Sequence, residues 1–127
     1  MSRKVLIVDD ELHILESVSY VVRSIGMDPL TAEDGEEAVR LAQTQRPDLI
    51  ILDVMLPKLS GLQVCESIRA HPDTRQIPIL MLSARGQESD EVQGMQAGAD
   101  EYMTKPFSPR RLRARIEELV LKNESSR

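Results

Sequence analysis

Three continuously apolar stretches occur along the chain, and each ends at a polar residue. They run from Val5 to Val8, from Leu49 to Leu52 and from Ile79 to Leu82. Strands buried on both faces of a parallel sheet have this pattern, whereas strands with one solvated face alternate. Two further short stretches, Pro29 to Ala32 and Glu101 to Thr104, are more polar, as is typical of edge strands. The pattern therefore predicts five strands.

Segments of helical period lie between and after these strands. Their apolar stripes are Ile14, Val18, Val21 and Ile25, then Leu62, Cys65 and Ile68, and finally Leu112, Ile116, Leu119 and Val120. Gly26 and Gly98 stand where helices end, and Ser108 before Pro109 is a typical helix start. Parallel neighbours need crossovers, and helical crossovers cover the sheet faces. We therefore expect an α/β fold with a doubly wound five-stranded parallel sheet and five helices.

The length and composition suit a single domain. A chain of 127 residues with 41% hydrophobic residues should bury about two thirds of its unfolded surface. We expect this domain to span residues 1–122, and residues 123–127 to form a tail or the start of a linker. Cys65, the single cysteine, is expected to be a buried small hydrophobe, and Met81 and Met95 are expected in the core.

Charge and hydropathy exclude two classes of partner. The net charge of −5 argues against the broad positive surface that non-specific nucleic-acid binding requires. No apolar run approaches the roughly 18 residues of a membrane span, and the first residues lack a signal-peptide core. We therefore expect a cytoplasmic protein that contacts neither nucleic acid nor membrane through this domain.

Polar side chains with useful chemistry follow the predicted strands directly. Asp9 and Asp10 follow the first strand, Asp53 the third, Ser83 the fourth and Lys105 the fifth. Carboxyl ends of parallel strands face one crevice, so these side chains should converge. Neighbouring carboxylates repel by about 1 kcal/mol per pair in water, and a cation would relieve this repulsion. Oxygen ligands without His or Cys favour Mg²⁺ over Zn²⁺.

Each of these side chains, taken alone, also has an ordinary structural interpretation. Asp9 or Asp10 could cap the following helix, Asp53 could be a solvated loop acid and Ser83 another cap. Together they offer the parts that phosphoryl transfer needs: a carboxylate nucleophile, a metal, an ammonium group and a hydroxyl donor. The set therefore favours phosphoryl chemistry.

The ordered set of motifs resembles the receiver domain of two-component response regulators, in the CheY-like superfamily. The resemblance covers about Lys4 to Val120. It is carried by Asp9-Asp10 after a VLIV stretch, Asp53 within LIILDVMLPKLSG, Ser83-Ala84 after ILML, and Lys105-Pro106-Phe107. For the fold, the resemblance implies the flavodoxin-like strand order 2-1-3-4-5.

The resemblance also implies a phosphoacceptor and a metal site. Asp53 would receive the phosphoryl group from a phosphohistidine on a sensor histidine kinase or a phosphotransfer protein. Asp10, Asp53 and the carbonyl of Met55 would bind Mg²⁺, or Mn²⁺ in its place, with Asp9 acting through water. Because Met55 offers no hydrogen-bonding side chain and Arg85 is bulky, we expect slow self-dephosphorylation.

Other residues of the motifs would respond to the phosphoryl group. Lys105 would pair with one phosphoryl oxygen and Ser83 would bond another, while the Lys105–Pro106 peptide would be cis. Tyr102 matches the switch aromatic of the family, whose ring fills the space that Ser83 leaves. The alternative is an ordinary half-buried tyrosine in an edge strand.

The predicted fourth helix, fifth strand and fifth helix would form the output face. This segment places Asp100 opposite Arg111 and Arg115, with further charges at Asp90, Glu91, Glu101 and Arg110. Complementary charges of this kind could join two copies on phosphorylation. An ordinary solvated helix is the alternative, because exposed ion pairs contribute only about 0 to 1 kcal/mol. The segment resembles that of relatives that dimerise through this face and control a winged-helix DNA-binding domain, so a C-terminal effector domain in a longer protein is one expectation.

Two other functions are compatible with a strand-end aspartate. A Mg²⁺-dependent phosphohydrolase of the haloacid dehalogenase type usually has a second Asp two residues on, where this chain has Met55. A protein-binding scaffold that is never phosphorylated would not need the complete set of acids and Lys105. We therefore expect a signalling domain without turnover of a substrate, and not an enzyme.

Overall fold

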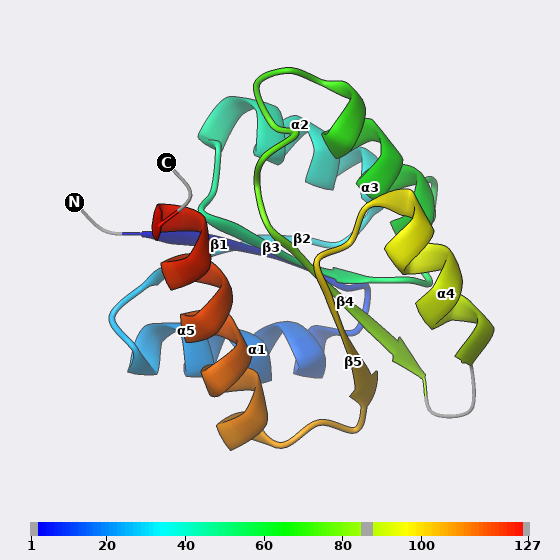
Figure 1. Cartoon of the computed structure of the whole chain (residues 1–127). Helices are drawn as coiled ribbons and strands as arrows, with labels where there is room; N and C mark the ends of the chain where they lie inside the picture. Colours follow the sequence, from blue (N-terminus) through cyan, green and yellow to red (C-terminus); the bar gives the residue numbers. More distant parts are fainter. Residues whose placement is uncertain (1–2, 85–87, 126–127) are drawn as a thin grey trace.

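A five-stranded parallel sheet forms the centre of the computed structural model, which describes residues 3–84 and 88–125 (Figure 1). The strand order is β2-β1-β3-β4-β5, as the resemblance implied. The strands are β1 (Lys4–Val8), β2 (Asp28–Ala32), β3 (Leu49–Asp53), β4 (Ile79–Ala84) and β5 (Glu101–Lys105). The helices are α1 (Leu12–Ser24), α2 (Gly35–Gln45), α3 (Gly61–Ala70), α4 (Glu88–Ala97) and α5 (Pro109–Ser125).

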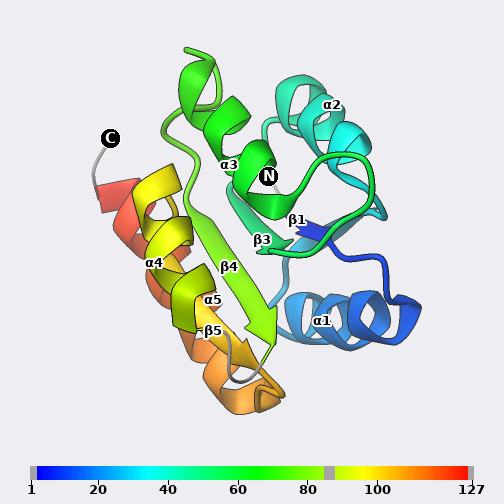
Figure 2. The same ribbon diagram turned by 90° about the vertical axis from the view of Figure 1, so that its right-hand side faces the viewer.

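Helices cover both faces of the sheet, which explains the uninterrupted apolar strands. Helices α1 and α5 lie on one face, and α2, α3 and α4 on the other (Figure 2). Successive residues of β1 contribute to the two cores in turn: Val5 and Ile7 pack toward α1 and α5, and Leu6 and Val8 toward α2 and α3. Since both sides are buried, neither set of side chains can be polar.

The two edge strands are less buried than the three central ones, as predicted. In β2 only Ala32 is fully buried, and in β5 only Met103. Pro29 lies within β2, where an edge strand tolerates a residue without a backbone N–H.

None of the described helices is long and apolar enough to cross a lipid bilayer.

The predicted helix boundaries agree with the backbone conformation and the capping hydrogen bond found at these positions. Gly26 and Gly98 follow α1 and α4 with φ angles of 78° and 112°, values that residues with a side chain rarely adopt. The Ser108 hydroxyl accepts a hydrogen bond from the Arg111 N–H at 3.1 Å and so caps α5.

Cys65 is fully buried, as expected, and burial raises the pKa of its thiol to about 11.

Two expectations about packing and boundaries differ from the structure. Met81 is buried, but Met95 is 47% exposed, so its prediction as a core residue was wrong. Gly94 takes the buried position of this turn of α4, and a side-chain carbon of Met81 comes within 3.5 Å of where its Cβ would lie. Helix α5 also continues to Ser125, so residues 123–125, which were expected in a tail, are helical.

Candidate functional site

The strand ends bring four distant parts of the sequence to one edge of the sheet. Asp9 follows β1, Asp53 is the last residue of β3, Ser83 lies near the end of β4 and Lys105 ends β5. The strand register aligns Asp53 with Leu82, and Ser83 with Thr104. Parallel pairing therefore sets these polar residues side by side, as the sequence predicted.

Three carboxylates converge at this edge. One carboxylate oxygen from each of Asp9, Asp10 and Asp53 lies within 4.8 Å of the other two. Asp9 and Asp53 are buried and Asp10 is exposed. Backbone donors orient the buried pair: Asp9 Oδ1 accepts from the Glu11 N–H at 2.9 Å, and Asp53 Oδ1 from the Met55 N–H at 3.2 Å. An all-oxygen donor set with one solvent-exposed side suits a hard divalent cation that keeps several waters.

Lys105 is the cation that contacts these acids in the described part of the chain. Its Nζ donates to Asp9 Oδ2 at 2.9 Å and to Asp53 Oδ2 at 3.0 Å. Glu11 Oε1 lies 3.6 Å from the same nitrogen. This third partner was not foreseen from the sequence, although its place next to Asp10 was a usable signal. One ammonium group therefore faces several carboxylates.

The pKa shifts of Asp53 and Lys105 reflect the excess of carboxylates over ammonium groups at this site. Burial raises the pKa of Asp53 above its ordinary value, the hydrogen bond from Lys105 opposes that rise, and the charge of Asp9 adds to it. Burial disfavours the charged form of Lys105, but its hydrogen bonds to Asp9 and Asp53 outweigh this effect and raise its pKa. Lys105 thus stays charged while the acids remain incompletely neutralised, a state that a divalent cation would relieve.

Two glycines hold the loop that follows Asp53, residues 54–60, in place. A Cβ on Gly61 would lie 2.2 Å from the Asp53 carbonyl oxygen, and one on Gly35 would lie 2.4 Å from the Leu59 carbonyl oxygen. The Gly61 N–H also donates to the Val54 carbonyl at 2.8 Å. Sequence reasoning missed both positions, because nothing in a sequence marks a close approach between distant backbone segments.

Comparison with known proteins identifies the family. Residues 5–117 match the family model of the response regulator receiver domain. The chain belongs to this family. It is 49% identical, over 98% of its length, to the alkaline phosphatase synthesis transcriptional regulatory protein PhoP of Bacillus subtilis, of which it covers 51%. It spans about half the length of the curated relatives it matches.

Solved structures support the same assignment. A putative response regulator from Chloroflexus aurantiacus superposes with a TM-score of 0.91 at 38% identity, covering 95% of this chain and 99% of the other. The receiver domain of the Pseudomonas aeruginosa sensor histidine kinase PA1611 has a TM-score of 0.87 at 32% identity, with 94% and 98% covered, and holds a magnesium ion in its active-site cleft. The phosphohydrolase and scaffold alternatives gain no support.

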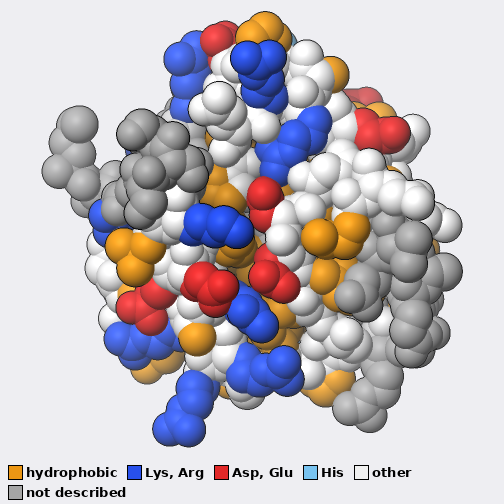
Figure 3. All heavy atoms as spheres, in the orientation of Figure 1, with side chains coloured by type: hydrophobic (Ala, Val, Ile, Leu, Met, Phe, Trp, Pro, Cys, Tyr) orange, Lys and Arg blue, Asp and Glu red, His pale blue; other side chains and the backbone are white. Residues whose placement is uncertain are grey.

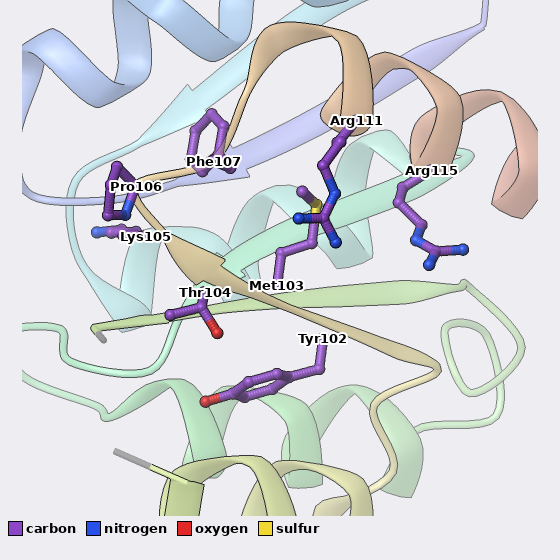
Figure 4. Close-up of a pocket in the computed structure, with 8 residues that line it drawn as sticks. All are labelled: Tyr102, Met103, Thr104, Lys105, Pro106, Phe107, Arg111 and Arg115. Atoms are coloured by element: carbon purple, nitrogen blue, oxygen red, sulfur yellow. The ribbon is translucent and has the colours of Figure 1, made fainter. Parts of the chain in front are cut away.

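The expected switch residues of this receiver domain contact each other. The hydroxyl groups of Ser83 and Tyr102 share a hydrogen bond. Ser83 is buried, and Tyr102 is half-buried on β5. The Lys105–Pro106 peptide is cis, as the resemblance implied. Figure 4 shows the Tyr102 ring on the opposite side of β5 from the two arginines of α5.

A groove of about 370 Å³ runs along β5 and the start of α5 in this receiver domain. Its lining residues are Tyr102, Met103, Thr104, Lys105, Pro106, Phe107, Arg111 and Arg115 (Figure 4). Figure 3 looks onto this part of the surface and shows acidic and basic side chains interleaved over it. Arg115 also contacts Glu118 at 3.1 Å. Arg111 and Arg115 therefore lie together on the expected output face.

Asp100 lies at the other end of the sheet from the carboxylates. Its Oδ2 accepts from Arg69 Nη2 at 2.7 Å and from the Ile79 N–H at 2.8 Å. It therefore bonds to α3 and to the start of β4, and this ion pair was not foreseen from the sequence. Arg85 and the side chains of Asp90 and Glu91 lie outside the described residues.

Proposed function

We propose that this receiver domain accepts a phosphoryl group on Asp53 from a phosphohistidine of a sensor histidine kinase or phosphotransfer protein. The observation that carries the proposal is the convergence of three carboxylate oxygens within 4.8 Å beside the Lys105 ammonium group. An isolated loop acid would need neither neighbour. The family membership gives this arrangement its chemical meaning.

The transfer step uses groups that the structure places at the edge of the sheet. An Asp53 carboxylate oxygen attacks phosphorus, the P–N bond of the phosphohistidine breaks, and the imidazole nitrogen keeps the electron pair. Lys105, now bonded to Asp53 Oδ2 at 3.0 Å, is close enough to pair with a phosphoryl oxygen. Ser83 would exchange its bond with Tyr102 for one to another phosphoryl oxygen.

A divalent cation fits the acids, and we propose Mg²⁺, with Mn²⁺ as a substitute. Asp10, Asp53 and the Met55 carbonyl would bind it, with Asp9 acting through water. The relative from Pseudomonas aeruginosa with magnesium in its cleft supports this assignment. When bound, the ion neutralises charge on the transferred group. The acyl phosphate on Asp53 would hydrolyse slowly. The domain would therefore act as a switch between two states, and it would not turn over a substrate as an enzyme does.

The proposed output is a change in the surface around β5. Tyr102 would move as Ser83 turns toward the phosphoryl group, and this would alter the face that carries Arg111 and Arg115. A homodimer formed through this face on phosphorylation is one expected result. Because a relative that the chain covers by only 51% is a transcriptional regulatory protein, we propose that a C-terminal effector domain is the target in a longer protein.

Incubation with acetyl phosphate and Mg²⁺ tests the proposal. Intact-mass spectrometry should show one phosphoryl adduct, and peptide mapping should place it on Asp53. Asp53→Asn should abolish the adduct and Lys105→Met should slow its formation, whereas Asp73→Asn, far from the acids, should change neither. Continuous release of phosphate would indicate a phosphohydrolase instead, and absence of any adduct would favour a scaffold.

A further inference from the structure

Met55 is a reactive side chain next to Asp53 that the proposed phosphoryl chemistry leaves unused. Its side chain is 67% exposed, whereas Met27, Met81 and Met103 are buried. Met95, on α4, is also exposed. Peroxides oxidise methionine thioethers to sulfoxides, and access from solvent decides which methionine reacts. Among the described methionines, Met55 and Met95 are therefore the candidates for oxidation.

The backbone fixes Met55 beside the acceptor carboxylate. Its N–H donates to Asp53 Oδ1 at 3.2 Å. The loop that carries it is confined because Gly61 approaches the Asp53 carbonyl too closely to admit a Cβ. The Gly35 N–H also donates to the Pro57 carbonyl in the same loop, at 3.3 Å. These contacts hold the backbone of Met55 beside Asp53, so a modification of the Met55 side chain takes place next to the acceptor residue.

We propose that Met55 is a site of reversible oxidation by hydrogen peroxide, and that its sulfoxide shortens the lifetime of the phosphoryl group on Asp53. The second half of this inference rests on the proposed function. The first half depends only on the exposed thioether and its confined loop. Phosphorylation of Asp53 and oxidation of Met55 would then take place two residues apart, at the end of β3 and in the loop that follows it.

The oxidation step balances without any further reactant. The sulfur lone pair attacks one peroxide oxygen and the O–O bond breaks. The second oxygen takes up the proton of the first and leaves as water. Sulfur loses two electrons and peroxide is reduced. A thioether is a weak hydrogen-bond acceptor, whereas the sulfoxide is polar. Its oxygen can hold a water next to the acyl phosphate, whose hydrolysis breaks the bond between phosphorus and the Asp53 oxygen.

Cys65 does not compete for the oxidant. It is fully buried, and burial raises the pKa of its thiol to about 11. The thiolate is the form that attacks peroxide, so this cysteine is protected at neutral pH. Oxidation of the described residues should therefore concentrate on the exposed methionines, and Met95 serves as an internal control because it lies on a different element.

The test combines peptide mass spectrometry with a measured phosphoryl lifetime. The protein is treated with hydrogen peroxide and digested, and part of each sample is phosphorylated with acetyl phosphate and Mg²⁺ before the donor is removed. We expect Met55 sulfoxide to form well before any sulfoxide of Met27, Met81 or Met103. Oxidation should shorten the phosphoryl lifetime severalfold, and methionine sulfoxide reductase should restore it.

Two variants separate the effect of Met55 from general damage. In Met55→Leu, peroxide should leave the lifetime equal to that of the same variant without treatment. In Met95→Leu, peroxide should still shorten it. Resistance of Met55 to peroxide, or an unchanged lifetime after its complete oxidation, would overturn the inference. If the untreated protein took up no phosphoryl group, the proposed function would fall together with the lifetime effect, while the sulfoxide would still be visible by mass.

Discussion

The two ends of the parallel sheet differ in their balance of positive and negative charge. At the carboxyl end, the Lys105 ammonium group faces the carboxylates of Asp9 and Asp53 at 2.9 and 3.0 Å, with Asp10 close by. At the amino end, each of the three guanidinium nitrogens of Arg69 has a partner: the Asp100 carboxylate and the carbonyl oxygens of Gly98, Arg75 and Ile77 accept at 2.6 to 2.9 Å. The first cluster carries more negative than positive charge, and the second is balanced.

This difference separates a reactive site from a structural one. The Arg69 cluster joins α3, the loop before β4, the end of α4 and the start of β5, so its role is to hold elements together. The carboxylates hold the fold less well, because two of them are buried beside each other and repel. Such a cost is typical of a functional site, where a ligand restores the balance.

Removing Arg69 should have the largest effect on stability. Arg69→Met would remove the four hydrogen bonds to Asp100, Gly98, Arg75 and Ile77, and we expect a loss of about 3 kcal/mol in the free energy of unfolding. Urea denaturation measures this loss. Arg40→Met is the control, since its pair with Glu37 is 3.9 Å long and exposed, and it should change stability by less than about 0.5 kcal/mol. Equal losses would show that the Arg69 cluster is not structural.

Adding Mg²⁺ should act at the carboxyl end alone. At 100 times its dissociation constant, Mg²⁺ should stabilise the fold by about 2.7 kcal/mol, visible as a rise in melting temperature that EDTA reverses. Asp53→Asn should blunt this rise because it removes one ligand. Arg69→Met should lower the starting stability but keep the rise, and its loss there would mean that the two ends are not independent.

Neutralising Asp53 should have the smallest effect, and it should stabilise the fold, whereas the loss of Arg69 destabilises it. Without metal at neutral pH, Asp53→Asn should be more stable than the wild type by about 1 kcal/mol, the scale of one like-charge pair in water. Exposed Asp28→Asn serves as the control and should be nearly neutral.

The pH dependence of this difference follows from the raised pKa of Asp53. The folded state keeps the proton to higher pH than the unfolded state, so wild-type stability falls as pH rises from the ordinary value of 3.8 through the raised one. The advantage of Asp53→Asn should open across that window and vanish below it. Chemical denaturation at several pH values checks this, and an advantage that persisted below the window would contradict it.

Sequence patterns predicted the elements because burial dictated them. The central strands are apolar throughout since helices cover both faces, and the acids converge because parallel strands end at one edge. Asp53 and Ser83 lie within β3 and β4, because the strand pairing includes these residues although their side chains are polar. Met95 was misplaced because the stripe of α4 is ambiguous, and a glycine took the buried position.

The partners of Arg69 could not be found from the sequence. Most are backbone carbonyls, which every residue carries, so no residue type marks them. The same holds for Gly61, whose constraint comes from the Asp53 carbonyl across the loop. Sequence reasoning found the polar side chains that gather at the strand ends, and it missed the backbone contacts that hold the surrounding elements together.

The bond between Ser83 and Tyr102 gives this protein a built-in optical reporter. The chain has no tryptophan and two tyrosines, Tyr20 and Tyr102. Tyr20 is 74% exposed on α1 and should report a constant aqueous environment. A Tyr20→Phe variant would leave Tyr102 as the single source of tyrosine absorbance and fluorescence, so the arrangement of its hydroxyl group could be followed in real time without a label.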